Sequence, residues 1–412
     1  MTEVEIITIG DELLIGQVVD TNSAWMATTL NNSGFDVRFK STVGDIAADI
    51  ADAIDRAMRR ASIVLLTGGI GPTNDDITKQ TLCDFFHTRL VFDPATLKNI
   101  EDVSGANRRV LNEITRTQAF VPEDCTVIQN RVGTAPITWF CRDGHILVSM
   151  PGVPYEMKWA MENEIIPRLQ AFFVERVTIV HRSFWVKNYT ESMLARKLTR
   201  FEENLSKYVK LAYLPTSGII RLRLTGKSFD KLEVNCAVAQ ASDALIALLA
   251  DDIVSVADDG LEYALHRVLI ERNLTLSLAE SCTGGALSAL FTAIPGCSQY
   301  YRGGAVVYSN DAKINVLGVS HSAIEQNGAV SREVVIEMAA GARRVFGSDC
   351  SIAVSGIAGP DGGTADKPIG TVWIAVSCDN KCVAQEFHFT RVREANILRA
   401  CTNGIRMLLE II

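Results

Sequence analysis

The sequence predicts a multidomain α/β protein, because short apolar segments typical of strands alternate with amphipathic segments typical of helices. Glycine-rich polar loops recur where the predicted strands end, which is the arrangement of ligand-binding α/β folds. With 412 residues the chain exceeds one ordinary hydrophobic core, so two or three domains are expected. Changes in the pattern divide the chain into residues 1–170, 171–255 and 256–412.

The first domain begins with a regular alternation of elements. We expect strands at Val4–Ile9, Asp36–Val43 and Ile63–Leu66, and helices at Thr21–Asn32 and Asp45–Ala61. The resulting β-α-β-α-β order predicts a parallel, doubly wound sheet.

Two loops of this domain, Gly10–Gly16 and Thr67–Thr78, follow predicted strands and carry polar residues. The second loop is rich in glycine and leads into a helix, so its backbone N–H groups can cradle a phosphate. It lacks the lysine of a P-loop, which argues against Walker-type ATP hydrolysis. Acidic residues at a helix start also serve as plain caps, but acids on both loops favour a metal–phosphate site for magnesium or manganese. The predicted site contains Asp11, Glu12, Gly68, Gly69, Gly71 and Pro72, with Asp75 and Asp76 as metal ligands.

The middle domain has a different pattern. Strands are expected at Val174–Val186, Val209–Leu214 and Ile219–Leu224, and helices at Glu191–Asn204 and Leu232–Leu249. No Gly-x-x-Gly loop, which nucleic-acid-binding KH domains use to clamp a backbone, occurs in this segment. A spacer or dimer-contact role is therefore favoured over RNA binding.

The third domain contains a loop between the predicted strand Leu274–Ala279 and the predicted helix Ala286–Ile294. The loop places Ser281 near a helix N-terminus, whose N–H groups and dipole suit a phosphate or a developing oxyanion. From the residues alone, Ser281 could cap the helix, act as a nucleophile, or do neither. The N–H groups around Thr283–Gly285 could form an oxyanion hole.

A serine nucleophile needs a base, and a later turn offers one. Lys313 can accept a proton if burial lowers its pKa, and Tyr308 lies in the same turn. There is no Gly-x-Ser-x-Gly elbow, and His321 and His388 lie in segments without other catalytic features. A Ser–Tyr–Lys arrangement is therefore favoured over a Ser-His-Asp triad.

The composition of the chain argues against nucleic acid and membrane as binding partners. A net charge of −8 argues against non-specific nucleic-acid binding. The sequence shows no signal-peptide pattern and no apolar run of membrane length, so a cytoplasmic protein without a membrane partner is expected. Ten cysteines are scattered without a Cys-x-x-Cys pair, which predicts free thiols in a reducing compartment.

The segments Gly68–Pro72 and Asp75–Thr78 resemble the molybdopterin-binding domain of molybdenum-cofactor biosynthesis proteins. The segments Gly133–Pro136 and Met150–Met157 narrow the resemblance to the N-terminal domain of the CinA (competence/damage-inducible) family. That family commonly has glycine where this chain has Ile137, which affects only local turn geometry.

Nearly all of residues 260–412 resemble the CinA C-terminal domain, whose members include nicotinamide-nucleotide amidohydrolases. The resemblance implies conversion of nicotinamide mononucleotide and water to nicotinate mononucleotide and ammonia, without a cofactor. It implies Ser281 as nucleophile with Tyr308 and Lys313 as activating partners, and Cys282 as a second, less favoured nucleophile. The family often has threonine at Ser355, which is a mild departure. The implied substrate contacts are Cys282, Thr283, Gly284, Gly285, Ser355, Gly356, Ala358, Gly359, Gly363 and Thr364.

Taken as a whole, the chain resembles full-length CinA proteins, which join the two domains through a small α+β domain of KH-like topology. Some full-length members also hydrolyse ADP-ribose to AMP and ribose 5-phosphate in the N-terminal domain, with magnesium, manganese or cobalt and with potassium. The resemblance also implies a homodimer. The alternative is a non-catalytic regulatory protein that binds a nucleotide or pterin and is linked to competence or DNA repair.

Overall fold

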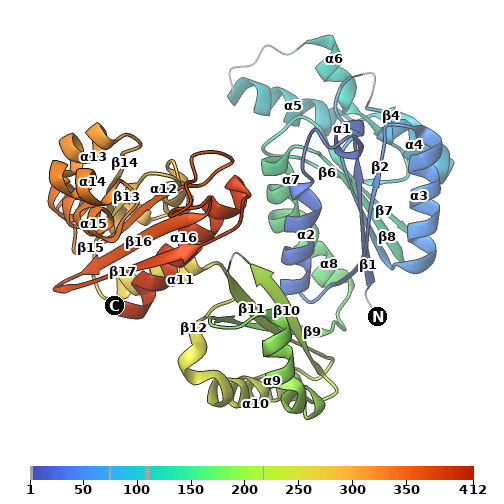
Figure 1. Ribbon diagram of the computed structural model, residues 1–412. Coiled ribbons are helices and arrows are strands. Elements are labelled where there is room, and N and C mark those ends of the chain that lie inside the picture. Colours follow the sequence, from blue (N-terminus) through green and yellow to red (C-terminus); the bar gives the residue numbers. More distant parts are fainter. Residues whose placement is uncertain (1–2, 74–75, 107–111, 217) are drawn as a thin grey trace. The chain divides into compact units, whose positions relative to one another are not determined.

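The computed structural model describes residues 3–73, 76–106, 112–216 and 218–412. The chain separates into two compact units, Met1–Val180 with Lys227–Val234, and His181–Gly226 with Asn235–Ile412. Each unit is described by itself (Figure 1). The predicted domain boundaries at residues 170 and 255 stay predictions.

The first unit is built on a six-stranded sheet with the order β2-β1-β3-β8-β7-β6. Its strands are β1 (Glu3–Ile9), β2 (Asp36–Val43), β3 (Ile63–Thr67), β6 (Thr126–Ile128), β7 (Ile137–Arg142) and β8 (His145–Met150). Strands β2, β1, β3 and β8 are parallel, as expected, but β7 pairs antiparallel with both of its neighbours, β8 and β6. Asp143 and Gly144, both at positive φ, join β7 to β8 in a two-residue hairpin, so no crossover helix can make this pair parallel.

Helices cover both faces of this sheet (Figure 1). The remaining elements of this unit are the helices α1 (Asp11–Leu14), α2 (Thr21–Asn32), α3 (Ala47–Arg60), α4 (Thr78–Phe86), α5 (Pro94–Ala106), α6 (Glu113–Arg116), α7 (Pro154–Ala160) and α8 (Ile166–Phe172), the 3₁₀ helix η1 (Thr117–Ala119), the π-helix η2 (Met161–Ile165) and the strand pair β4 (Leu90–Phe92) and β5 (Phe120–Pro122). Ile6 packs with residues of α2 and α7, and its neighbour Ile7 packs with residues of α3 and α4. Adjacent residues of β1 thus face opposite cores, which explains why both of these neighbouring positions are apolar.

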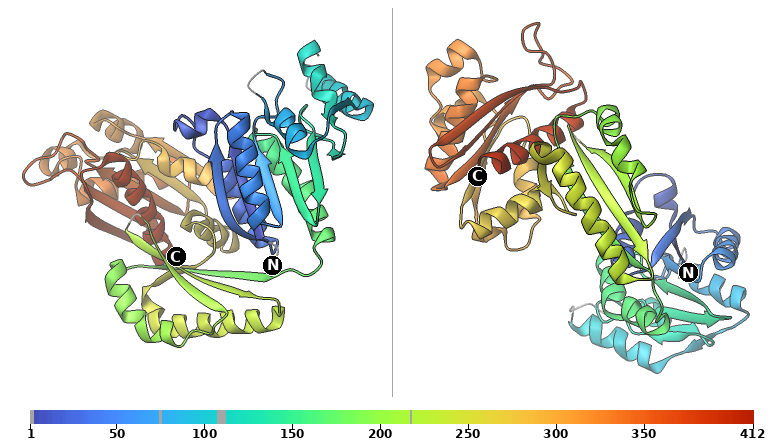
Figure 2. Two further views of the ribbon diagram at one scale, coloured as in Figure 1. Left: turned by 90° about the vertical axis from the view of Figure 1, so that its right-hand side faces the viewer. Right: turned by 90° about the horizontal axis from the view of Figure 1, so that it is seen from below.

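The middle of the chain forms a four-stranded sheet with the order β10-β11-β9-β12. Its elements are β9 (Thr178–Val186), α9 (Glu191–Glu203), β10 (Val209–Thr216), β11 (Ile219–Ser228), α10 (Lys231–Leu249), η3 (Ala250–Asp252) and β12 (Ile253–Val256). These positions agree with the predicted strands and helices, and α10 lies alongside the strands (Figure 2). The KH-like topology stays a prediction.

One helix differs from the expectation that no segment is long and apolar enough to cross a membrane. By length and composition alone, Lys231–Asp252 passes that test. However, Val234, Val238, Leu245 and Leu249 are buried at helical spacing. This is the pattern of a helix that packs against its own domain.

The C-terminal part repeats the architecture of the first unit around a five-stranded sheet with the order β14-β13-β15-β16-β17. The elements are α11 (Leu261–Glu271), β13 (Leu276–Glu280), α12 (Ala286–Thr292), η4 (Cys297–Gln299), β14 (Tyr301–Val306), α13 (Asn310–Leu317), α14 (His321–Asn327), α15 (Arg332–Phe346), β15 (Cys350–Gly356), β16 (Thr371–Cys378), β17 (Lys381–His388) and α16 (Arg393–Ile411). Strands β14, β13 and β15 are parallel, so the loops that follow them leave the same edge of the sheet. The expected α/β fold of this domain is confirmed.

The cysteines differ from the expectation in one place. Cys350 and Cys378 stand opposite each other on antiparallel strands β15 and β16, with their Cα atoms 4.2 Å apart, and they form a disulfide. The prediction that all thiols are free is therefore wrong for this pair. Spacing in the sequence could not reveal it, because the two residues meet only through strand register.

Candidate functional site

The serine loop, residues 281–285, leaves β13 at the parallel edge of the C-terminal sheet. The Ser281 Oγ is 3.0 Å from the Nζ of Lys313, which comes from helix α13. The same Nζ donates to the Val307 carbonyl at 2.9 Å. Both side chains are buried. The structure thus brings together the predicted serine and lysine, 32 residues apart in the chain.

The environment of Lys313 makes its amine easier to deprotonate than that of an exposed lysine. Burial lowers the pKa of Lys313, and the neighbouring Cys282 thiol opposes the shift only in part. A neutral amine at 3.0 Å can take the hydroxyl proton of Ser281 through the existing contact. The pair therefore has the geometry of a nucleophile and its base.

The helix that follows the serine loop is capped from within the protein. Three N–H groups at the start of α12, those of Gly285, Leu287 and Ser288, donate to the Glu280 carboxylate at 2.8–3.0 Å. Ser281 therefore does not cap this helix, and the expectation of an open anion site at its N-terminus is wrong. Glu280 is fully buried, and an acidic residue at the end of an apolar strand was the signal that sequence reasoning missed.

Because of these contacts, fewer N–H groups are free to form the proposed oxyanion hole. Within the described residues, the Gly284 N–H donates to the Ser281 carbonyl and the Gly285 N–H donates to Glu280, whereas no protein acceptor contacts the Thr283 N–H. The Thr283 hydroxyl is also buried without a partner. Of the predicted donors, Thr283 alone stays available to a substrate oxygen.

Tyr308 does not join the serine–lysine pair. Its side chain is exposed, and its hydroxyl accepts a hydrogen bond from Arg393 at 3.0 Å. Arg393 also donates to the Gly359 carbonyl at 2.7 Å, so it connects Tyr308 to the second predicted loop. Sequence reasoning missed Arg393, although a cation in the first turn of a helix is electrostatically unfavourable and could have drawn notice.

The second predicted loop, residues 355–364, is partly structural. The Ser355 hydroxyl is buried and donates to the Ala329 carbonyl at 2.7 Å. Among the predicted contacts, Ala358 and Gly359 are buried, Gly356 is half-buried, and Gly363, Thr364 and Gly284 are exposed. Lys367, just beyond the loop, donates to the carbonyls of Asn327 and Val330 and holds it against the end of α14.

Cys282 is a poor nucleophile in this setting. Burial raises the pKa of its thiol to about 12, so the reactive thiolate is strongly disfavoured near neutral pH. The contact of Ser281 with Lys313 and the raised pKa of Cys282 together favour Ser281 as the nucleophile.

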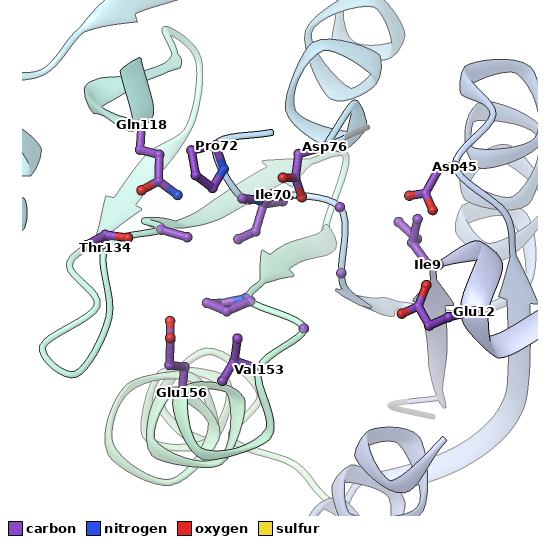
Figure 3. A pocket seen from close by; sticks show the side chains of 17 residues that line it. Ile9, Glu12, Asp45, Ile70, Pro72, Asp76, Gln118, Thr134, Val153 and Glu156 are labelled. Atoms are coloured by element: carbon purple, nitrogen blue, oxygen red, sulfur yellow. Dashed lines mark hydrogen bonds between the residues drawn. The ribbon is translucent and has the colours of Figure 1, made fainter. Parts of the chain in front are cut away.

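A separate cavity of about 360 Å³ lies in the first unit, at the carboxyl ends of its parallel strands (Figure 3). Its lining includes the predicted residues Glu12, Gly68, Gly69, Gly71, Pro72 and Asp76, and also Asp45, Gln118, Thr134 and Glu156, which were not predicted. Gly68 has a φ of 115°, and a side chain there would collide with the Ile9 carbonyl. The glycine is thus required for the close approach of the loop to β1.

Two acidic residues of this cavity, Asp45 and Asp76, already accept hydrogen bonds from the backbone. Asp76 accepts the N–H of Gly71 at 2.7 Å and the N–H of Thr73 at 2.8 Å, and so closes the glycine loop. Asp11 and Asp45 accept each other's backbone N–H at 3.2 and 3.0 Å, which ties their two loops together.

These contacts limit the fit of a metal ion. Asp75 lies outside the described residues. Among those described, no three His, Cys, Asp or Glu side chains gather to hold a metal. Glu12, Asp45 and Asp76 nevertheless line one cavity, and magnesium commonly binds one or two carboxylates together with substrate phosphates. The residues therefore fit a metal that arrives with a phosphorylated ligand.

The chain is similar to known proteins along most of its length. A family model described as CinA C-terminal domain matches residues 258–412, and one described as probable molybdopterin binding domain matches residues 5–171. A CinA-like protein of Cytophaga hutchinsonii is 42% identical over 393 residues, which cover 95% of this chain and 94% of that protein. A CinA-like protein of Flavobacterium psychrophilum is 38% identical over 405 residues, which cover 98% and 97%. The crystal structure of the competence damage-inducible protein A from Klebsiella pneumoniae matches with 37% identity and a TM-score of 0.36, over 37% of this chain and 94% of that one.

Proposed function

The chain belongs to the CinA family, and from this premise we propose that its C-terminal domain hydrolyses the amide of nicotinamide mononucleotide to give nicotinate mononucleotide and ammonia. The observation that carries the proposal is the buried contact between Ser281 Oγ and Lys313 Nζ at 3.0 Å. The contact places a possible base on a possible nucleophile, and burial lowers the pKa of that base.

The reaction follows from this geometry in two stages. Neutral Lys313 takes the proton of Ser281 as its oxygen attacks the amide carbon, and the Thr283 N–H stabilises the negative charge on the carbonyl oxygen. Lys313 then gives the proton to the leaving nitrogen, ammonia departs, and a nicotinoyl ester stays on Ser281. Water, deprotonated by the same lysine, attacks the ester carbon, the bond to the Ser281 oxygen breaks, and Lys313 returns the proton to that oxygen as the nicotinate product leaves.

Arg393 suits the negatively charged end of this substrate. Its guanidinium lies at the loop edge, and its hydrogen bond to Tyr308 raises its pKa, so it stays cationic. A guanidinium binds phosphate through paired hydrogen bonds. We assign Arg393 to binding of the substrate phosphate. Tyr308 positions Arg393 by accepting its hydrogen bond.

The direct test is incubation of the purified full-length protein with nicotinamide mononucleotide while ammonia is measured. Release by the wild type and not by Ser281→Ala supports the proposal. If the wild type binds the nucleotide without releasing ammonia, the binding-protein alternative is favoured for this domain.

For the N-terminal domain we propose metal-dependent hydrolysis of ADP-ribose to AMP and ribose 5-phosphate. The supporting observation is a cavity that combines a glycine loop with the carboxylates of Glu12, Asp45 and Asp76. A divalent metal, when bound there, neutralises pyrophosphate charge and activates water. Asp76 keeps the loop in shape by accepting the N–H groups of Gly71 and Thr73. The N–H groups of Gly69 and Ile70 would be the ones that hold the phosphates. Assay of AMP release with magnesium, manganese or cobalt tests this proposal. Nucleotide binding without AMP release supports a purely binding domain.

A further inference from the structure

A groove of about 750 Å³ lies between helices α9 and α10, and it shares no residue with either proposed reaction site. The two helices lie side by side on one face of their sheet (Figure 1). The apolar side chains of Phe201, Ala244 and Leu248 line the groove. Along α9 the lining runs over residues 196–204, which span about 12 Å at 1.5 Å per residue. The groove is therefore long enough for about two turns of a second helix.

Helix α10 presents more apolar surface than its own sheet covers. The segment Lys231–Asp252 is apolar enough to pass the composition test for a membrane span, yet only 33% of its most apolar stretch is buried. At the groove, Leu248 is 43% exposed. On α9, Met193 is 49% exposed and lies one turn before Lys197, which lines the groove. Exposed apolar side chains that gather along a groove are typical of an interaction surface.

The rim of the groove is basic. Arg196, Lys197 and Arg200 line it, and Glu203 is the acidic residue among the lining side chains. Lys197 is already engaged, since its Nζ lies 3.8 Å from the Asp252 carboxylate. Arg196 and Arg200 are exposed, and in the part of the chain that the structure describes neither guanidinium has an ion-pair or hydrogen-bond partner. Two arginines one helical turn apart suit carboxylates at the same spacing.

Apolar lining and a basic rim together fit an amphipathic helix with an acidic polar side. We propose that the groove between α9 and α10 binds an acidic amphipathic helix of a partner protein. Phe201 and Leu248 contact the apolar anchors of that helix. Arg196 and Arg200 pair with carboxylates that are spaced one turn apart on it. This interaction does not depend on either proposed reaction.

Other occupants fit the groove less well. A nucleic acid is bound through many phosphate contacts, whereas Arg196 and Arg200 are the unpaired cations among the described residues that line the groove. A membrane surface needs an apolar face that projects from the protein, whereas Phe201 is half-buried in a concave groove. A symmetric dimer through this face would bring the two arginines close to their own copies, which repulsion between like charges disfavours.

The proposal is tested by fluorescence anisotropy with the full-length protein and a labelled synthetic peptide. The peptide carries leucines at i, i+3, i+4 and i+7 and glutamates on its other face, and a second peptide has lysine in place of each glutamate. The glutamate peptide should bind about tenfold or more tightly than the lysine peptide, and added salt should weaken its binding. Arg196→Glu combined with Arg200→Glu should lower its affinity roughly 10- to 100-fold, because two attractive pairs become repulsive.

Arg56→Glu combined with Arg59→Glu is the matched control. These arginines lie about one turn apart on helix α3, with side chains 61% and 76% exposed, and they do not line the groove. This variant should bind the glutamate peptide as tightly as the wild type. Leu248→Glu provides a second test, because a carboxylate on the apolar lining should also weaken binding of the glutamate peptide.

The outcomes separate the partner helix from other occupants. Binding of the glutamate peptide that both groove variants weaken supports the proposal. Equal binding of the two peptides, binding of neither, or binding that both groove variants retain overturns it. Sedimentation of the protein with phosphatidylglycerol vesicles, abolished by the arginine variant, overturns it in favour of a membrane surface. Light scattering in which Leu248→Glu converts a dimer to a monomer overturns it in favour of a second copy of the chain.

Discussion

The serine loop and the N-terminal cavity occupy equivalent places, since each lies at the carboxyl ends of parallel strands in an α/β sheet. Their polar groups are used differently. In the serine loop, Lys313 meets Ser281 directly and Glu280 satisfies the helix N-terminus, so the reacting groups are assembled within the protein. In the cavity, Asp76 accepts hydrogen bonds from the backbone of its own loop, and the Gln118 amide oxygen has no hydrogen-bond partner. In the first site the proposed reacting groups are side chains already in contact, whereas the second site needs a bound metal and nucleotide to be complete.

Removal of either member of the serine–lysine pair should have the largest effect. Ser281→Ala and Lys313→Ala should each lower the rate of ammonia release from nicotinamide mononucleotide by about 10² to 10⁴, the range for a lost nucleophile or base. Cys282→Ala is the control and should stay near the wild-type rate, because its thiol pKa of about 12 keeps it unreactive. If Cys282→Ala loses activity while Ser281→Ala retains it, the nucleophile is wrongly assigned.

ADP-ribose hydrolysis in the N-terminal cavity should be sensitive to metal removal and to loss of Asp76. A chelator, or Asp76→Ala, should lower ADP-ribose hydrolysis by roughly 10² or more, since metal charge neutralisation supplies much of the rate and Asp76 shapes the phosphate loop. Ammonia release should be unchanged in both cases, because Lys313 is the base at the other site. Asp84→Ala, on the exposed side of α4, is the control. Chelator that stops both activities would contradict the contrast between the sites.

The sequence predicts more of one site than of the other, for a physical reason. The resemblance to the CinA C-terminal domain pairs Ser281 with Lys313, and the two residues do follow neighbouring parallel strands. Glu280 and Gln118 were missed because the importance of each depends on burial and on partners that only packing supplies. Arg393 lies 85 residues from Tyr308, which no local pattern can bridge. The closure of the glycine loop by Asp76 spans five residues or fewer, and turn chemistry could have indicated it.

The pH dependence should also distinguish the sites. Lys313 accepts a proton only when neutral, so ammonia release should rise with pH, roughly tenfold per unit, and level off above the pKa of Lys313. Because burial lowers that pKa, the plateau should begin below the ordinary lysine value of 10.5. The measurement is kcat/KM between pH 6 and 10. A profile that is flat over this range, or one that Lys313→Ala retains in full, contradicts the role of Lys313 as base.

The smallest expected effect concerns Tyr308, for which resemblance and geometry give different expectations. The resemblance implies that Tyr308 activates Ser281, which would place the hydroxyl in the proton path and make its loss cost about 10² or more in kcat. The geometry places the exposed hydroxyl against Arg393, which keeps a second anchor at the Gly359 carbonyl. On that basis Tyr308→Phe should raise KM about two- to tenfold and leave kcat nearly unchanged, since one exposed hydrogen bond contributes about 0.5–1.5 kcal/mol. Tyr263→Phe, on helix α11, is the matched control and should change neither constant. A large fall in kcat for Tyr308→Phe would show that the tyrosine turns toward Ser281 when substrate binds. The serine site, like the N-terminal cavity, would then be complete only with its ligand bound.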